Sequence, residues 1–189
     1  RSHMSRVALV TRGTRGIGRG CSFALKEAGY NVAANYGGND ERAKTFNQES
    51  GIPIYKWDVG DLQACEKGIA EVETDLGVIE ILINNAAISP DRFMHKMPPE
   101  TWRATINTNL HSCFNMCHTI VPGMRQRKWG RIVFISSVNA HRNPVAINHL
   151  RSGEYALALA AGVSEESPNR QAEILLEETM ALVPSGVKP

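Results

Sequence analysis

The turn VTRGTRGIG, residues 10–18, is the feature that most constrains the fold of this chain. A short apolar run precedes it and a stretch with helical spacing follows it, so the turn joins a buried strand to a helix. Gly16 and Gly18 carry no side chain where that helix begins. Unpaired backbone N–H groups and the helix dipole favour an anion there. The turn predicts a phosphate-binding site, and an ordinary tight turn is the alternative.

The chain up to about Ser137 repeats this alternation of apolar strands and helices. Near-continuous apolar strands are typical of a parallel sheet that is covered on both faces. We therefore predict an α/β fold, a Rossmann-like doubly wound parallel sheet, with functional residues at the carboxyl ends of its strands. Strands are expected at 6–11, 31–36, 52–59, 79–86 and 130–137, and helices at 18–30, 40–50, 62–77 and 99–124, the last ended by Pro122.

The sequence loses this rhythm after about residue 140. Short helices are expected at 154–162 and 169–183, but no clear sixth or seventh strand follows. Residues 1–4, RSHM, are typical of a cloning scar and are left out of the expected fold. We expect a single dinucleotide-binding domain over residues 5–189, of which 140–189 is atypical.

The composition argues against several classes of protein. The 189 residues include 42% hydrophobic and 21% charged residues with a formal net charge of +2, which is ordinary for a globular chain and does not suggest nucleic-acid binding. No apolar run is long enough to span a membrane. Irregularly spaced cysteines without a secretory segment predict reduced thiols in a cytoplasmic protein. No metal is expected, because His118 is rotated away from Cys113 and Cys117 on a helix.

Several motifs, in order along the chain, resemble the short-chain dehydrogenase/reductase family, most closely its acetoacetyl-CoA reductase type. Members of that type reduce a 3-oxoacyl thioester to the (R)-3-hydroxy thioester in polyhydroxybutyrate synthesis, and the resemblance implies the same reaction here. The matching motifs are VTRGTRGIGRG (10–20), NYGGNDERAKTF (35–46), YKWDVGD (55–61), ILINNAAIS (81–89), FMHKMPPETW (93–102), INTNLHSCFNM (106–116) and GMRQRKWGRIVFISSVN (123–139).

The ends of the strands carry the candidate cofactor-binding residues. NAD-specific sites usually have an acid after the second strand, but Asn35 and Tyr36 stand there, and Arg15 offers a cation for a 2′-phosphate. NADP(H) is therefore the expected cofactor, although a merely solvated Arg15 is the alternative. The resemblance adds residues at the adenine and the adenosine ribose, and the full set is Thr11, Gly13, Arg15, Gly16, Ile17, Gly18, Asn35, Tyr36, Asp58, Val59, Asn85, Ala86 and Ala87.

Two residues depart from the family pattern in this region. Arg12 stands where the family turn has its first glycine, and a side chain at positive φ costs about 1 kcal/mol or more. Arg12 either intrudes near the adenosine ribose or supplies a charge for a 2′-phosphate. Ala87 stands where the family usually has a glycine close to the cofactor, and its methyl group would crowd that cofactor.

The resemblance implies two catalytic residues. Ser137, at the end of the fifth strand, would orient the substrate carbonyl, and Asn109 on the long helix would support a water-linked proton relay. The alternatives are a serine that caps local backbone and a satisfied buried amide.

The tyrosine and lysine that the family uses for proton transfer are absent from their usual positions. The tyrosine comes thirteen residues after the serine and the lysine four later, but Leu150 and Glu154 stand there, and Tyr155 lies one residue beyond. Three explanations remain open: loss of an internal piece, a divergent and catalytically dead relative, or a misread or joined sequence.

Substrate and partners follow from the resemblance. Asp91 and Lys96 match positions that face the acyl-CoA, and an exposed loop lysine is the alternative for Lys96. The expected substrate is an acyl-CoA or acyl-carrier-protein thioester. A homotetramer is expected to form through the long helix, with Cys113, Phe114 and Cys117 as candidate contacts. The alternative function is a non-catalytic relative that binds nucleotides or partners other subunits.

Overall fold

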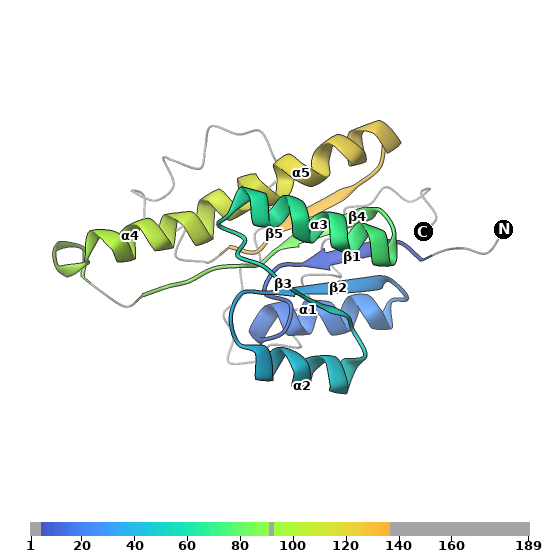
Figure 1. The fold of residues 1–189 in the computed structure, drawn as a ribbon, viewed down its shortest axis with the longest axis horizontal. Coiled ribbons are helices and arrows are strands. Elements are labelled where there is room, and N and C mark those ends of the chain that lie inside the picture. The colour runs from blue at the N-terminus through green and yellow to red at the C-terminus, as the bar shows by residue number, and fades with distance from the viewer. Residues whose placement is uncertain (1–4, 91–92, 137–189) are drawn as a thin grey trace.

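The computed structural model describes residues 5–90 and 93–136, and Figure 1 shows their arrangement. The helices expected at 154–162 and 169–183 lie outside these residues. The elements are β1 (Val7–Val10), α1 (Gly16–Glu27), β2 (Asn31–Tyr36), α2 (Asp40–Ser50), β3 (Ile54–Lys56), α3 (Leu62–Leu76), β4 (Ile79–Asn84), the 3₁₀ helix η1 (Met94–Lys96), α4 (Pro99–Ile106), the π-helical turn η2 (Asn107–His111), α5 (Ser112–Arg127) and β5 (Arg131–Phe134).

The five strands form one parallel sheet in the order β3-β2-β1-β4-β5. The chain builds outward from β1 through β2 to β3 and then returns to place β4 on the other side of β1. This reversal is the point of a doubly wound sheet at which ligands bind, outside the carboxyl ends of the strands. The predicted doubly wound fold is confirmed over the described residues.

Two apolar clusters cover the two faces of the sheet. Successive residues of β1 alternate between them: Val7 and Leu9 pack with α3 and α5, whereas Ala8 and Val10 pack with α1 and α2. The consecutive helical segments α4, η2 and α5, residues 99–127, are called the α4–α5 rod below. Figure 1 shows α3 and this rod on one side of the strands and α1 and α2 on the other. Because both faces are buried, the strands lack the polar alternation of a half-exposed sheet.

The long helix differs from its prediction at two places. It begins at Pro99 as expected, but it runs to Arg127 with Pro122 in its interior, so the prediction that Pro122 ends it is wrong. Met116, Ile120 and Met124 stay buried on both sides of the proline, and this packing outweighs the local cost of a proline, about 3 kcal/mol. The helix also widens into a π-helical turn at Asn107–His111.

Two strands are shorter than predicted. β3 covers only Ile54–Lys56 of the expected 52–59, because it pairs at the sheet edge with Ala34–Tyr36 alone. β5 covers Arg131–Phe134 of the expected 130–137. The apolar pattern marked buried residues correctly, but the extent of a strand depends on its partner. In the described part of the chain, no helix is both long and apolar enough to cross a membrane.

Candidate functional site

The turn after β1 presents the start of α1 to the carboxyl edge of the sheet. α1 begins at Gly16, and the residue before it, Arg15, makes no side-chain capping hydrogen bond. The first turn of the helix carries no acidic residue. Its N–H groups are therefore available to an anion. Two residues of the turn have left-handed backbone, Arg12 at φ 53° and Gly16 at φ 52°.

The glycines of the turn have different tasks. A Cβ added to Gly16 would meet no atom within 4 Å, so the space in front of it is open to a ligand. A Cβ on Gly13 would lie 2.9 Å from both Ser22 Oγ and the Val10 carbonyl oxygen. A Cβ on Gly18 would collide with the carbonyl of Arg12 and the amide of Asn85. Gly13 and Gly18 thus permit close packing, whereas Gly16 leaves room for a phosphate.

The buried hydroxyl of Thr11 ties the ends of β1 and β4 together. Its Oγ1 accepts hydrogen bonds from the backbone N–H of Asn85 at 2.9 Å and of Ala86 at 3.0 Å, and it donates to the Ile83 carbonyl at 3.3 Å. The Asn85 side chain donates to the Thr11 carbonyl at 3.0 Å. The structure therefore places Thr11 and Asn85 where they position the edge of the site.

Asn35 joins three segments at the end of β2. Its Nδ2 donates to the Trp57 carbonyl at 3.1 Å, and its Oδ1 accepts from the Arg12 N–H at 3.4 Å. Its own carbonyl accepts from the Gly13 N–H at 2.9 Å. Only 1% of Asn35 is exposed, so this amide acts chiefly by holding the turn against β3.

A cavity of about 400 Å³ opens at this edge of the sheet. Three arginines, Arg12, Arg15 and Arg42, line it, and none of them forms an ion pair among the described residues. Asp58 is the one carboxylate in the lining, and its Oδ1 accepts from the Gly60 N–H at 2.8 Å. The cavity therefore carries an excess of positive charge. The other lining residues are Thr14, Asn35, Tyr36, Gly37, Gly38, Asn39, Trp57, Val59, Ala86, Ile88 and Thr108.

The structure brings six of the predicted cofactor residues into the lining: Arg15, Asn35, Tyr36, Asp58, Val59 and Ala86. The remaining seven predicted residues are not in the lining: Thr11, Gly13, Gly16, Ile17, Gly18, Asn85 and Ala87. Of these, Ile17 packs on the cluster under α1, and Ala87 is exposed.

The first acid after β2 is neutralised by a neighbouring lysine. Asp40 Oδ1 lies 2.8 Å from Lys56 Nζ, and the hydrogen bond to Lys56 holds the pKa of Asp40 below its usual value. Burial and then the nearby Asp40 raise the pKa of Tyr36. Asp40 is therefore engaged with Lys56 and does not line the cavity, so no carboxylate meets a ligand at the end of β2.

Asn109 lies in the π-helical turn and holds the segment after β4. Its Oδ1 accepts from the Ile88 N–H at 2.8 Å and its Nδ2 donates to the Ile88 carbonyl at 2.9 Å. Asn109 is exposed, which differs from the buried amide of the alternative interpretation, but both polar atoms of its amide are satisfied as that interpretation supposed. Because Ile88 and Thr108 line the cavity, the two hydrogen bonds between the Asn109 side chain and the Ile88 backbone fix one wall of the site.

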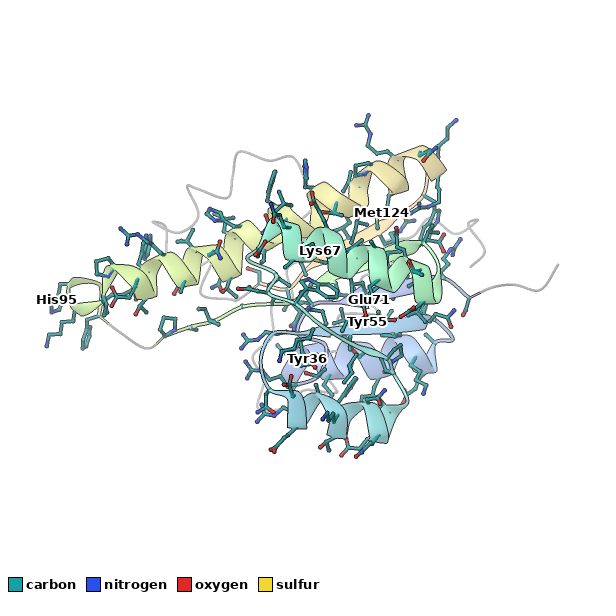
Figure 2. All side chains as sticks on the ribbon, viewed as in Figure 1. Tyr36, Tyr55, Lys67, Glu71, His95 and Met124 are labelled. Atoms are coloured by element: carbon teal, nitrogen blue, oxygen red, sulfur yellow. The ribbon has the colours of Figure 1, made fainter. Side chains whose placement is uncertain are left out.

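Of the remaining predicted site residues, the structure describes Lys96, which does not line the cavity. Lys96 is exposed at the end of η1, and Figure 2 places the neighbouring His95 at the far tip of the α4–α5 rod from Met124. Ser137, Asp91, Leu150, Glu154 and Tyr155 lie outside the described residues.

Sequence reasoning missed Arg42, which lines the cavity from the first turn of α2. The Asn39 side chain caps this helix by accepting from the Arg42 N–H at 2.8 Å. The signal was available, because the start of a helix that follows a strand lies at the carboxyl edge of a parallel sheet. Trp57, Ile88 and Thr108 were also missed, and no local pattern marks them.

The cysteines and acids of the described residues do not gather into a metal centre. No cluster of three or more His, Cys, Asp or Glu side chains in this part of the chain could hold a metal ion. Burial raises the pKa of the Cys113 and Cys117 thiols. Neutral thiols on α5 are poor metal ligands and poor nucleophiles.

The fold and this cavity define a dinucleotide-binding protein of the doubly wound class. A family model described as short chain dehydrogenase matches residues 6–149, and the chain belongs to that family. The family and the Rossmann-like sheet imply a nicotinamide nucleotide cofactor.

The particular relatives are similar over much of the chain. An acetoacetyl-CoA reductase of Rhizobium meliloti (strain 1021) is 56% identical over 164 residues, which are 86% of this chain and 68% of that protein. An acetoacetyl-CoA reductase of Shinella zoogloeoides is 59% identical over 139 residues, 74% of this chain and 58% of the relative. The chain thus spans about three-fifths to two-thirds of the length of these relatives.

A solved structure shares the fold. The serine dehydrogenase from Escherichia coli superposes with a TM-score of 0.75 at 24% sequence identity, over 96% of this chain and 94% of that one. This likeness concerns the fold alone.

Proposed function

We propose that the chain acts in the NADP(H)-dependent reduction of a 3-oxoacyl thioester, acetoacetyl-CoA to (R)-3-hydroxybutyryl-CoA, the reductive step of polyhydroxybutyrate synthesis. The observation that carries the proposal is the cavity at the end of β2, which has three arginines in its lining against one carboxylate, Asp58, and no carboxylate from the end of β2 itself. The similarity to two acetoacetyl-CoA reductases supports the choice of substrate.

The residues present fit a nicotinamide dinucleotide with a 2′-phosphate. The open space before Gly16 and the uncapped start of α1 suit a pyrophosphate. Arg15 and Arg42 suit a 2′-phosphate, because a guanidinium offers several donors in one plane. When bound, the dinucleotide supplies a hydride to the ketone carbon of the substrate.

The chain's own residues would orient the substrate carbonyl and hold the wall of the site beside it. Ser137 would donate a hydrogen bond to the ketone oxygen, and the alkoxide that hydride transfer leaves would take its proton from solvent water, since Leu150 stands at the family's tyrosine position. Asn109 holds the backbone of Ile88 and so keeps the wall after β4 in place. Asp91 and Lys96 would meet the thioester carrier, either CoA or an acyl-carrier protein.

Calorimetric titration tests the cofactor part of this proposal. We expect NADPH to bind at least about tenfold more tightly than NADH, because one charge-assisted contact to the 2′-phosphate contributes about 1.5–3 kcal/mol. Equal affinities, or tighter binding of NADH, would contradict it. Comparing acetoacetyl-CoA with acetoacetyl-carrier protein in a reductase assay identifies the carrier.

A second candidate function rests on Leu150 and Glu154, which stand at the family's tyrosine and lysine positions. On this alternative the chain binds the nucleotide without turning over, as a sensor or subunit partner. Leucine donates no proton and glutamate puts a negative charge where the lysine would act. General acid catalysis contributes about 10²–10⁴-fold, so turnover should fall by at least that factor.

The two candidates separate in one spectrophotometric assay with NADPH and acetoacetyl-CoA. Turnover within the usual enzyme range of about 1–10³ per second excludes the binding-only function. A trace rate in the wild type that rises when Leu150→Tyr and Glu154→Lys are combined supports the binding-only function. A matched variant with Leu150→Phe and Glu154→Lys lacks the phenol and should stay at the trace rate.

Self-assembly through the α4–α5 rod is part of the proposal. Phe114 is 61% exposed on α5, and Trp102 and Leu110 are 46% and 45% exposed on the preceding turns. Cys113 and Cys117 are partly buried and contribute less surface. A homotetramer would cover these side chains. Light scattering should show at least a dimer at micromolar concentration, and a clean monomer would contradict this.

A further inference from the structure

Arg12 occupies a backbone conformation that L-residues rarely adopt. Its φ is 53°, and Lys128 is the other non-glycine residue with positive φ among those described. Such a conformation costs about 1 kcal/mol or more for a residue with a side chain. A strained residue persists where the surrounding structure over-determines it and is often part of a functional site.

Asn35 and Asn85 hold Arg12 in this conformation. Asn35 Oδ1 accepts from the Arg12 N–H at 3.4 Å, and Asn85 Nδ2 donates to the Arg12 carbonyl at 3.5 Å. Gly18 packs beneath that carbonyl at a distance that no side chain would permit. The backbone of Arg12 is therefore fixed from both sides, and only its side chain is free to respond to a ligand.

The Arg12 side chain contributes to the cavity and forms no ion pair within the described part of the chain. It lines the cavity together with Arg15 and Arg42, and these three cations come from the end of β1, the residue before α1 and the first turn of α2. No acidic side chain of the described residues pairs with any of them. Three like charges around one cavity repel one another until a polyanion binds.

The chemistry of this cluster matches a phosphate monoester. A phosphate monoester carries a charge of about −1.5 to −2 at neutral pH and offers three acceptor oxygens, so more than one guanidinium is needed to neutralise it. The phosphodiesters of a pyrophosphate carry one charge each and have the start of α1 and the open face of Gly16 available to them.

We propose that Arg12 is a specificity-determining residue that binds the 2′-phosphate of NADP(H) together with Arg15 and Arg42. This inference rests on the proposed function, since it assigns a further ligand to the same cofactor. Arg12 adds a cation at a position where a glycine would offer only backbone, and it raises the preference for the phosphorylated dinucleotide.

The test compares Arg12→Gly, Arg12→Lys and Lys128→Gly with the wild type by calorimetry, using NADPH, NADH, adenosine 2′,5′-bisphosphate and 5′-AMP. Arg12→Gly should weaken NADPH and the bisphosphate roughly 10- to 100-fold and change NADH and 5′-AMP less than about twofold. Arg12→Lys should retain part of the affinity, because it keeps the charge and loses the planar donors.

Lys128→Gly is the matched control for backbone strain. Lys128 has φ 57° at the end of α5 and does not line the cavity. Both glycine variants should raise the melting temperature by a few degrees, since each relieves a positive φ. Only Arg12→Gly should alter the binding of phosphorylated ligands.

Each contrary outcome has a distinct meaning. If the wild type does not prefer NADPH or the bisphosphate, the proposed function itself fails. If the wild type shows the preference and Arg12→Gly keeps it, the inference about Arg12 alone is wrong. Tighter binding of both dinucleotides to Arg12→Gly would show that Arg12 obstructs the turn, and equal weakening of both would assign it to the pyrophosphate; either result overturns the inference.

Discussion

The two edges of the parallel sheet carry similar numbers of arginines, but those at the amino edge contact other protein groups, whereas those lining the cavity at the carboxyl edge have no acidic partner among the described residues. At the amino edge, Arg6 lies 3.7 Å from Glu80 and 3.9 Å from the centroid of the Trp129 ring. Arg127 donates to the Ile79 carbonyl at 2.9 Å, and Arg131 lies over the Trp129 ring, 5.2 Å from its centroid. At the carboxyl edge, the arginines of the cavity have no acidic partner among the described residues.

This difference separates structural cations from ligand-binding cations. A guanidinium that is already stacked and paired has little left to offer a ligand. An arginine that lines a cavity without a partner keeps its donors available and adds to a positive potential. The parallel arrangement produces the contrast, because loops at the carboxyl edge lead into helix N-termini, which also favour anions.

Removing Trp129 should produce the largest effect at the amino edge. Trp129 packs on the cluster under α1 and α2 and accepts a cation–π contact from Arg6. Trp129→Ala should lower the free energy of unfolding by about 2–3 kcal/mol, less than for a fully buried tryptophan. Urea denaturation measures this loss. The affinity of the folded variant for NADPH should stay within about twofold, and a larger change would break the proposed separation of the two edges.

Removing Arg42 should weaken cofactor binding and leave stability nearly unchanged, the reverse of the Trp129 substitution. Arg42→Ala should weaken NADPH binding roughly 10- to 100-fold, leave NADH within about twofold and change stability by less than about 0.5 kcal/mol. Calorimetry and denaturation measure the two quantities. The matched control is Arg19→Ala, because Arg19 pairs with Glu49 at 3.1 Å outside the cavity. A loss of NADPH affinity in Arg19→Ala as large as in Arg42→Ala would indicate a diffuse surface effect.

Tyr55 tests a polar pair that belongs to the fold and not to the cavity. Its hydroxyl donates to Asp75 Oδ2 at 3.0 Å, and Figure 2 shows it close to Glu71 of α3. Burial, followed by the hydrogen bond to Asp75, raises the pKa of Tyr55 to about 12. A raised pKa contributes stability that is complete below the ordinary value near 10 and is lost as the pH rises through about 12.

Between pH 10 and 12, the wild type should therefore lose about 1 kcal/mol more stability than Tyr55→Phe. Denaturation curves of both proteins over this range measure the difference. Parallel decline of the two proteins would mean that the Tyr55 phenol titrates as it does in the unfolded chain.

Salt should produce the smallest effect and sharpen the contrast between ligands. Raising the ionic strength from about 50 to 500 mM should weaken NADPH binding about threefold more than NADH binding, because only NADPH presents the 2′-phosphate to the exposed Arg15. Titrations at several salt concentrations give the two slopes. Identical slopes would place the discriminating contact outside the arginine-lined cavity.

The sequence alone determined the class of fold and the edge at which the site lies. β2 and α2 have the predicted bounds, Asn31–Tyr36 and Asp40–Ser50, and in the structure the Asn39 side chain caps the start of α2, a contact between neighbours in the sequence. Arg12 has a positive φ, the conformation whose cost the comparison with the family's first glycine raised. The resemblance to the family also rests on short contiguous motifs.

Only the tertiary structure decided where elements end and which predicted residues line the cavity. Pro122 fails to end α5 because Met124 beyond it is buried against the sheet, a contact that no local pattern contains. Thr11 and Asn85 look like ligand contacts in the sequence, yet their polar atoms bond to the ends of β1 and β4. Arg42 joins Arg15 at one cavity from another helix. Which residues meet at the cavity depends on the order in which the crossovers place the strands in the sheet, and the residues adjacent in the sequence do not specify that order.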